Sequence, residues 1–505
     1  MIKIKLNEAN FEYDIYHLIR AFYPQETVEI ITPEAKDKYE GAQCLMEGRV
    51  QYLSHQLKIS MDYQEGADGV VPSFFHQVAE WNIDYENRKE TKNILKRAVY
   101  KMLSNATGRT LSWGTLTGIR PVKIISDLLE SGSSLSQAER VMKKTYLIGE
   151  EKTKLGLSIA QKEKEIMERV KGKYSLYIGI PFCPTTCLYC SFTSYPILQW
   201  KDRMEDYIRA LFLELDFLAG QLKKEEISTI YIGGGTPTSL PADLLKMLLG
   251  KLSDTFYHEG LLEFTVEAGR PDSITEEKLS VMKTFPVSRI SINPQTMNQR
   301  TLDYIGRRHT VEQTIRCFEM AREHGFDNIN MDLILGLPNE GMAEIAHTME
   351  EIKKLSPDNL TIHSMAVKRA SKWNQILESR KEQEEKRNGA DREEELLAEK
   401  MMSLAMDTAK ELSLNPYYLY RQKNMKGNLE NIGFAKEGKE GIYNILIMEE
   451  RQNIFAAGAG AMSKFLLEGG RILRVENVKD VKNYLERTEE MIDRKRIVLS
   501  TESVL

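Results

Sequence analysis

The chain has 505 residues, of which 42% are hydrophobic and 28% are charged, as in folded globular proteins and unlike disordered chains. Lys plus Arg (69) against Asp plus Glu (74) gives a net charge of −5, which does not favour a nucleic-acid partner. No run of about 18 apolar residues predicts a membrane span. The alternating start, MIKIKLNEANFEYD, is typical of a strand and not of a signal peptide. We therefore expect a cytoplasmic protein of about three structural units, with no nucleic-acid or membrane partner.

The first predicted unit is an α+β domain over residues 1–170. Its strands are predicted at Ile2–Leu6, Val28–Ile31 and Leu45–Met61, and its helices at about 89–106, 120–131 and 135–169. The last helix is highly charged and is expected to lead into the next unit.

Strands and helices alternate over the second predicted unit, residues 171–370. Strands are predicted at residues 175–182, 228–234, 262–268, 289–295, 328–336 and 359–367, with helices between them. Near-continuous apolar strands in this alternation predict a parallel sheet covered by helices. Periodicity alone leaves open whether the sheet is a curved partial barrel or an open doubly wound sheet.

The third predicted unit, residues 371–505, is a small α+β unit with a charged helical lead-in at about 372–412. Short apolar segments follow at residues 417–422, 443–450, 453–460 and 471–477, and a helix is predicted at about 478–492.

Three of the five cysteines, Cys183, Cys187 and Cys190, have the spacing C-x3-C-x2-C directly after the first strand of the alternating unit. Three thiolates in one loop suit a soft metal centre. Structural zinc needs four ligands, and neither a second CxxC pair nor an HxxxH occurs elsewhere. An iron–sulfur cluster with three Cys ligands leaves one iron open for chemistry, so the spacing favours a cluster over zinc or inert core thiols. Cys44 and Cys317 are expected to be ordinary buried thiols, and an odd number of cysteines argues against a disulfide framework.

The segment YIGIPFCPTTCLYC (177–190) resembles the signature of radical S-adenosylmethionine (SAM) enzymes, and more narrowly that of the oxygen-independent coproporphyrinogen III oxidase family. The resemblance implies an α/β fold: a partial (βα)6 barrel with an added N-terminal α+β domain and a C-terminal α+β unit. It also implies a 4Fe–4S cluster on the three clustered cysteines, with SAM as the second cofactor. The segments GTLTGIRPVK (114–123) and 417–441 are similar to the longer coproporphyrinogen dehydrogenase (HemZ-like) subgroup.

Further segments that match the family's motifs lie at the ends of the later strands, where ligand sites of parallel sheets collect. They are GGGTPT (233–238), Glu267, the segment 289–309 with GRRH at its end, and DLILGLP (332–338). The resemblance implies SAM contacts by Tyr177, Tyr189, Gly234, Gly235, Thr236, Glu267, Gln295, Arg307, Asp332 and Ala366. Without the resemblance, Asp332 would be assigned to a structural ion pair with Arg307, and Ala366 to the core.

The chain departs from the family's motifs at several places. AGRP (268–271) stands where the family has Asn-Pro, NP (293–294) where it has Gly-Val, and Gly179 where many relatives have His. Many oxidases of the family carry a further Cys two positions after the cluster, where this chain has Phe192. Relatives without this Cys include haem chaperones.

By resemblance, the chain is expected to be an oxidoreductase of haem biosynthesis. It would use a 5′-deoxyadenosyl radical to decarboxylate two propionates of coproporphyrinogen III, giving protoporphyrinogen IX. The expected partners are the tetrapyrrole and an electron donor such as flavodoxin or ferredoxin. The alternatives are a haem-binding chaperone of the same family, another radical SAM reaction on a tetrapyrrole, and a zinc-stabilised structural protein. Arg120 and Lys123 are assigned either to a propionate carboxylate or to the start of a helix, and His309 and His363 are candidates to line the site.

Overall fold

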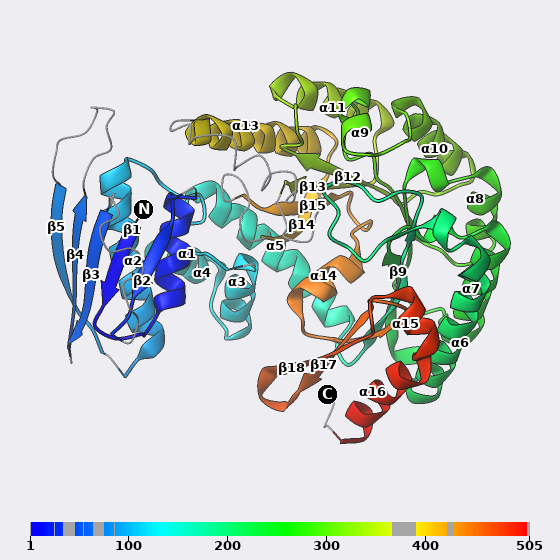
Figure 1. Cartoon of the computed structure of the whole chain (residues 1–505), viewed down its shortest axis with the longest axis horizontal. Coiled ribbons are helices and arrows are strands. Elements are labelled where there is room, and N and C mark those ends of the chain that lie inside the picture. The colour runs from blue at the N-terminus through cyan, green and yellow to red at the C-terminus, as the bar shows by residue number, and fades with distance from the viewer. Residues whose placement is uncertain are drawn as a thin grey trace. The chain divides into compact units, whose positions relative to one another are not determined.

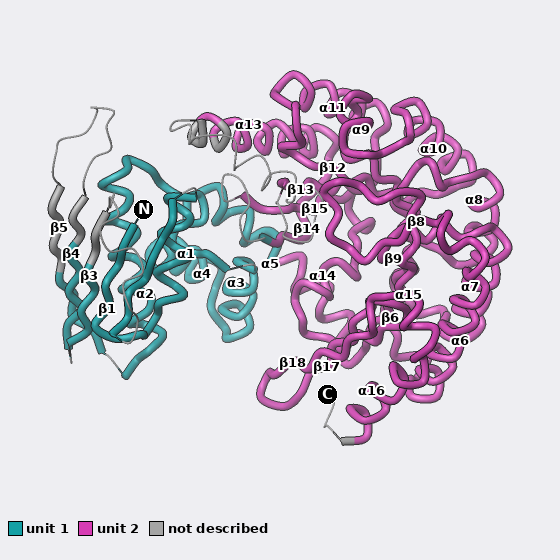
Figure 2. The backbone as a smooth tube through the Cα atoms, in the orientation of Figure 1, with its two compact units in different colours: residues 1–160, 421–424 teal, residues 161–420, 425–505 magenta. Residues whose placement is uncertain are grey.

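The structure is a computed structural model that describes residues 2–24, 26–33, 46–53, 55–63, 75–84, 86–118, 120–365, 390–421 and 429–501. Two compact units are observed, shown in different colours in Figure 2: residues 1–160 with 421–424 (unit 1), and residues 161–420 with 425–505 (unit 2). The predicted division into three domains, at residues 170 and 370, stays a prediction. No helix among the described residues is long and apolar enough to span a membrane.

Unit 1 is a five-stranded sheet packed against helices. Its strands are β1 (Ile2–Leu6), β2 (Val28–Ile31), β3 (Met46–Leu53), β4 (Gln56–Tyr63) and β5 (Phe75–Asn82), and its helices include α1 (Glu12–Phe22), α2 (Arg88–Thr107), α3 (Pro121–Glu130) and α4 (Leu135–Thr145). The sheet order is β2-β1-β3-β4-β5. Apolar side chains of β1, α1, β4 and α2 form one core, in which Ile2, Leu18, Leu57 and Leu103 are fully buried.

The prediction of a single strand over Leu45–Met61 is wrong. Strands β3 and β4 pair antiparallel as a hairpin, with Leu53 opposite Gln56. Buried and exposed side chains alternate in both arms, but the phase shifts at the turn, since Val50 and Tyr52 are buried in β3 and Leu57 and Ile59 in β4. The prediction of one strand overlooked this shift. Strand β5, which pairs antiparallel with β4, was not predicted.

Unit 2 is built on an eleven-stranded sheet in the order β14-β15-β13-β12-β11-β10-β9-β6-β16-β17-β18. Its centre consists of the predicted strands, which are β6 (Tyr174–Ile180), β9 (Ile227–Gly234), β10 (Glu263–Gly269), β11 (Arg289–Ile292), β12 (Ile329–Leu335) and β13 (Asn359–Ser364). These strands pair in parallel in chain order. The predicted α/β class with a parallel sheet is therefore confirmed.

The helices that connect these strands lie along one outer side of the sheet (Figure 1). They are α6 (Met204–Gln221), α7 (Ala242–Phe256), α8 (Glu276–Lys283), α9 (Gln299–Tyr304), α10 (Val311–Glu323) and α11 (Met342–Leu355). Local sequence sets where they begin: the Thr310 hydroxyl accepts the Gln313 N–H (3.1 Å), and the Gln313 side chain accepts the Thr310 N–H (2.9 Å).

The central strands have one apolar face and one polar face, because successive side chains of a strand point to opposite sides. Ile178 of β6 and Ile232 of β9 belong to the apolar face, which the connecting helices cover. Tyr177, Tyr231 and Glu267 belong to the other face. The expectation of near-continuous apolar strands therefore holds for one face only, since helices α6 to α11 are confined to one side.

The C-terminal residues add strands to both edges of the same sheet. At the β13 edge, helix α13 (Ala390–Glu411) precedes β14 (Asn415–Tyr420) and β15 (Asn431–Ala435), and β15 pairs antiparallel with β13. Helix α14 (Ile442–Glu449) follows. At the β6 edge, the sheet is extended by β16 (Asn453–Ala457), β17 (Met462–Leu467) and β18 (Arg471–Glu476). Helices α15 (Val481–Glu486) and α16 (Thr488–Thr501) follow, and α16 packs against α6.

A buried ion pair joins the C-terminal helix α16 to α6. Lys495 Nζ lies 2.5 Å from Glu214 Oε1, and both side chains are fully buried. The Glu214 carboxylate also accepts hydrogen bonds from the Tyr484 hydroxyl (2.7 Å), the Asn477 amide (2.7 Å) and the Gly458 N–H (2.8 Å). This carboxylate therefore holds the turn after β16 and the C-terminal helices against α6.

We expect Lys495→Met to lower the free energy of unfolding by about 3–5 kcal/mol, because it leaves the Glu214 carboxylate buried without its cation. Urea unfolding followed by circular dichroism measures the change. Lys482→Met, on the exposed surface of α15, is the matched control and should change stability by less than about 0.5 kcal/mol. Equal losses in the two variants would show that the buried pair does not stabilise the fold.

Candidate functional site

The three clustered cysteines lie in the connection after β6, at the carboxyl end of the parallel strands. Strand β7 (Phe182–Cys183) pairs in parallel with β8 (Tyr195–Pro196), which closes the base of this connection. The Cys183 and Cys187 side chains are buried and Cys190 is partly exposed. The Cys190 N–H donates to the Cys187 carbonyl (3.2 Å), so the cysteine loop is folded back on itself.

The three thiols of this loop are better suited to bind a metal cluster than to exist as thiolates without a metal. Burial, with the neighbouring thiols of the same loop, raises the pKa of the Cys183 thiol to about 12 and also raises that of Cys190. Among the described residues, no three His, Cys, Asp or Glu side chains converge on a single metal ion. A cluster of several irons fits three separate thiols, since each thiolate binds a different iron.

The glycine turn after β9 packs directly against the cysteine loop. The Thr236 N–H donates to the Phe182 carbonyl (2.7 Å), and the Thr236 hydroxyl lies 3.4 Å from the Cys183 sulfur. A Cβ on Gly235 would lie 2.6 Å from the Phe182 carbonyl oxygen, and Gly234 has a φ of +106°. Glycine is therefore required for this close approach.

A stack of aromatic rings lies on the polar face of the sheet beside Glu267. The ring centroids of Tyr177 and Tyr231 are 6.1 Å apart, and those of Tyr231 and Tyr443 of α14 are 4.5 Å apart. Burial, with the neighbouring Asp332 carboxylate, raises the pKa of Glu267 to about 8. Tyr231 and Tyr443 were not singled out in the sequence, and Tyr443 lies far from the other site residues along the chain.

Gln295 and Asp332 meet where β11 and β12 end. The Gln295 N–H donates to the Asp332 carbonyl (2.9 Å), and Gln295 has a φ of +69°. The Asp332 carboxylate accepts from the Asn330 amide (2.7 Å) and lies 3.8 Å from His363 Nε2. Burial opposes ionisation of Asp332, but His363 and the Asn330 amide hold its pKa below the usual value. This places His363, a candidate to line the site, beside Asp332.

Arg307 lies against the cysteine loop and not against Asp332, so the ion pair considered for these two residues is wrong. Its Nη1 donates to the Asn293 carbonyl. Burial opposes the charge of Arg307, but the Tyr189 hydroxyl and the Cys187 thiol beside it raise its pKa. Within the described part of the chain, Arg307 Nε and Asn293 Oδ1 have no hydrogen-bond partner. Unpaired polar atoms beside the loop are what a site for a polar ligand requires.

The remaining candidates lie as follows. His309 is fully buried, and burial together with the Arg307 charge lowers its pKa to about 3. Ala366 lies outside the described residues. Arg120 directly precedes helix α3 in unit 1. One residue that the sequence showed only as a departure from the family, Arg270, reaches the cysteine loop: its Nη1 lies 3.7 Å from the Cys187 sulfur.

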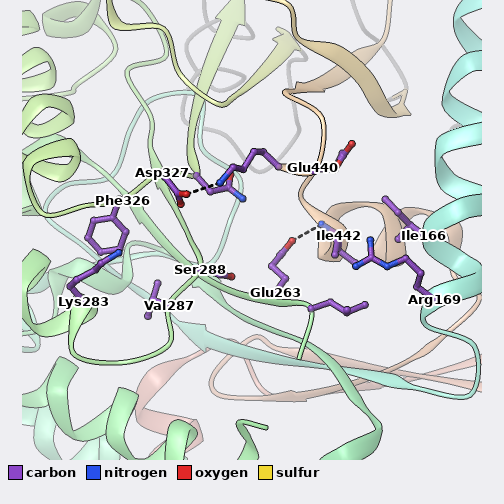
Figure 3. A pocket seen from close by; sticks show the side chains of 14 residues that line it. Ile166, Arg169, Glu263, Lys283, Val287, Ser288, Phe326, Asp327, Glu440 and Ile442 are labelled. Atoms are coloured by element: carbon purple, nitrogen blue, oxygen red, sulfur yellow. Dashed lines mark hydrogen bonds and ion pairs between the residues drawn. The ribbon is translucent and has the colours of Figure 1, made fainter. Parts of the chain in front are cut away.

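A separate pocket of about 330 Å³ lies at the opposite, amino ends of the strands (Figure 3). Glu263 at the start of β10 lines it, and its carboxylate accepts the Ile442 N–H (2.5 Å). Lys439, also in the lining, is paired with Asp327 (2.8 Å). No residue predicted to contact SAM or the cluster lines this pocket, so it is distinct from the candidate site.

Comparison with known proteins places the chain among radical SAM proteins. The model of the radical SAM superfamily matches residues 177–352. The oxygen-independent coproporphyrinogen-III oxidase-like protein HemZ of Bacillus subtilis is 45% identical over 414 residues, which are 81% of this chain and 81% of that protein. The heme chaperone HemW of the same organism is 31% identical over 313 residues, 62% of this chain and 75% of that protein. The structure of coproporphyrinogen III oxidase (HemN) from Escherichia coli aligns with a TM-score of 0.48 at 20% identity, over 65% of this chain and 73% of that one.

Replacement of Cys183, Cys187 or Cys190 by Ser is expected to remove most of the iron and acid-labile sulfide that the chain binds after anaerobic reconstitution, because serine is a poor ligand for a soft metal centre. Iron and sulfide per chain are the quantities to measure. Cys317→Ser is the matched control: Cys317 is a buried free thiol outside the loop, and its replacement should leave both values unchanged. Binding of zinc without sulfide by the unmodified chain would contradict the expectation.

The raised pKa of Glu267 predicts a pH dependence of stability. Because folding raises this pKa from 4.5 to about 8, the folded chain binds the proton more tightly, and the free energy of unfolding falls as the pH rises through this interval. The loss is about 1.4 kcal/mol for each unit by which folding raises the pKa. Glu267→Gln removes this contribution, so its stability relative to the unmodified chain should increase across the interval in urea titrations without iron or SAM. A difference that does not vary with pH would contradict the shift.

Proposed function

We propose a function on the premise that this chain belongs to the radical SAM family of oxygen-independent coproporphyrinogen III oxidase-like proteins, as its HemZ relative shows. Its cofactors are accordingly a 4Fe–4S cluster and SAM. We infer that it decarboxylates two propionates of coproporphyrinogen III to vinyl groups, giving protoporphyrinogen IX. The proposal includes an external electron donor such as flavodoxin or ferredoxin, an external electron acceptor that takes the electron remaining when each substrate radical loses carbon dioxide, and a cytoplasmic location.

The observation that carries the proposal is the contact between the three-thiol loop and the glycine turn, through Thr236 and the Cys183 sulfur. Cys183, Cys187 and Cys190 would hold the cluster. Gly234, Gly235 and Thr236 would hold the amino group of SAM, and Glu267 its ribose or methionyl end. The other proposed SAM contacts are Tyr177, Tyr189, Gln295, Arg307 and Asp332, while Ala366 stays a prediction.

When bound at Cys183, Cys187 and Cys190, the cluster would supply one-electron reduction of SAM, and SAM would supply the radical chemistry at the substrate. The side chains contribute binding, orientation and exclusion of water. The stacked rings of Tyr177, Tyr231 and Tyr443 offer an apolar surface beside Glu267 on the polar face of the sheet. With a pKa of about 8, Glu267 keeps its proton at neutral pH and can donate a hydrogen bond to a ligand oxygen.

Haem carriage is a second candidate function, favoured by Phe192. This residue stands where many oxidases of the family have a further Cys, and its side chain is 70% exposed beside the cysteine loop. An exposed aromatic ring there offers an apolar contact to a flat tetrapyrrole and no additional thiol. The heme chaperone HemW among the relatives supports the same alternative.

We expect the reconstituted, reduced chain to release 5′-deoxyadenosine and to convert coproporphyrinogen III into a product that has lost two carbon dioxide molecules. Anaerobic incubation with SAM, followed by mass spectrometry of both nucleoside and porphyrin, measures the two products together. Cys187→Ser is the negative control, and Cys317→Ser should retain both products.

The possible results separate the candidates. Deoxyadenosine without decarboxylation would exclude coproporphyrinogen III as the substrate and favour another radical reaction on a tetrapyrrole. Absence of SAM cleavage by a fully loaded cluster, together with stable haem retention, would overturn the enzyme proposal in favour of the carrier.

A further inference from the structure

Arg270 is a buried cation that the proposed SAM contacts leave unused. It follows directly after β10, and its residue is only 3% exposed. The Asp272 carboxylate binds one edge of the guanidinium group, with Nε to Oδ1 at 2.9 Å and Nη2 to Oδ2 at 2.6 Å. Burial opposes ionisation of Asp272, but this paired guanidinium holds its pKa below the usual value. The orientation of Arg270 is therefore set by a bidentate contact.

The remaining nitrogen of Arg270 faces the cysteine loop. Nη1 donates to the Thr185 carbonyl (2.9 Å) and hydroxyl (2.8 Å), and it lies 3.7 Å from the Cys187 sulfur. The Thr185 hydroxyl in turn donates to the Gly306 carbonyl (3.1 Å). Hydrogen bonds of Thr185 thus connect the loop to Arg270 at the end of β10 and to Gly306, directly before Arg307.

The simultaneous contacts to Asp272 and to the cysteine loop require the planar guanidinium group of an arginine. Two edges of one planar group contact Asp272 and the loop at once, whereas a lysine ammonium has a single nitrogen and cannot reproduce both contacts. The residue also belongs to AGRP (268–271), the segment that replaces the family's Asn-Pro. The contact to Cys187 is therefore made from a segment in which this chain departs from the family's motif.

We propose that Arg270 is a positioning residue for the cluster: it orients Cys187 and, by donating an N–H to that sulfur, raises the reduction potential of the cluster. The inference rests on the proposed function, since it requires the cluster on the cysteine loop. Reduction adds one electron, taken from the external donor, and so adds one negative charge to the cluster without making or breaking a bond. Hydrogen bonds to the sulfurs and nearby charge are among the factors that set such potentials. A donor on the Cys187 sulfur favours the reduced form.

The test is a redox titration of the reconstituted full-length chain, followed by the electron paramagnetic resonance signal of the reduced cluster. For Arg270→Gln and Arg270→Lys, we expect the ratio of reduced to oxidised cluster at a fixed potential to fall about tenfold, which is about 59 mV for a one-electron couple. Thr185→Val is the matched control for loop attachment, because it removes both hydroxyl contacts, from Arg270 Nη1 and to the Gly306 carbonyl, and leaves the N–H to sulfur contact in place. Arg300→Gln, on the exposed surface of α9, is the control for loss of one positive charge.

Midpoints of both Arg270 variants equal to that of the unmodified chain would overturn the proposal, and so would an equal shift in Thr185→Val. Only loaded chains give the signal, so partial loss of cluster does not prevent the measurement. Where the Arg270 variants fail to fold, the unmodified chain labelled with ¹⁵N-arginine decides: pulsed resonance must detect coupling of an arginine nitrogen to the reduced cluster, and absence of any such coupling overturns the proposal. Failure of the unmodified chain to bind any iron–sulfur cluster would instead refute the proposed function.

Discussion

The candidate site depends on the parallel pairing of β6 with β9, which continues beyond the ends of the two strands. The Gly235 N–H donates to the Ile180 carbonyl (2.8 Å), and the Thr236 N–H donates to the Phe182 carbonyl (2.7 Å). These backbone hydrogen bonds bring the glycine turn and the start of the cysteine loop to contact distance. Parallel strands present their carboxyl ends at one edge of the sheet, so the ends of β10, β11 and β12 complete the same site.

Two buried charges at the ends of the strands have partners that shape the site. Asp332 is held by Asn330 and His363, and Arg270 by Asp272. These pairs satisfy groups that would otherwise be costly to bury. The polar atoms that stay unpaired within the described residues include Arg307 Nε and Asn293 Oδ1, beside the cysteine loop. The site thus combines paired charges with free hydrogen-bonding groups next to the thiols.

The same principle extends to the C-terminal segment. Glu214 and Lys495 hold the turn after β16 against α6, and Tyr443 of α14 lies on the ring of Tyr231. The segment therefore contributes strands to both edges of the sheet and a side chain to its polar face. It is part of the architecture of the site and not an appendage to the central strands.

Much of the site could be predicted from the sequence because its signals are local. The C-x3-C-x2-C spacing, the three consecutive glycines and the alternation of strands with helices each occupy one short stretch of chain. Other features had no local signal. The polar face went unnoticed because it becomes visible only when strands are aligned. The hairpin of β3 and β4, in contrast, did have a local signal that the prediction overlooked, because the alternation shifts phase between the buried Tyr52 and Leu57.

The sequence by itself determined the six central strands, the position of the thiols after the first of them and the family to which these motifs point. Only the tertiary structure decided which charged groups meet: Asp332 with His363 and not with Arg307, and Arg270 with the Cys187 sulfur. The physical reason is that strand periodicity and motif spacing are set within a few residues, whereas ion pairs and hydrogen bonds between strand ends depend on sheet register. Register brings together residues that lie dozens of positions apart in the chain, and no single segment encodes it.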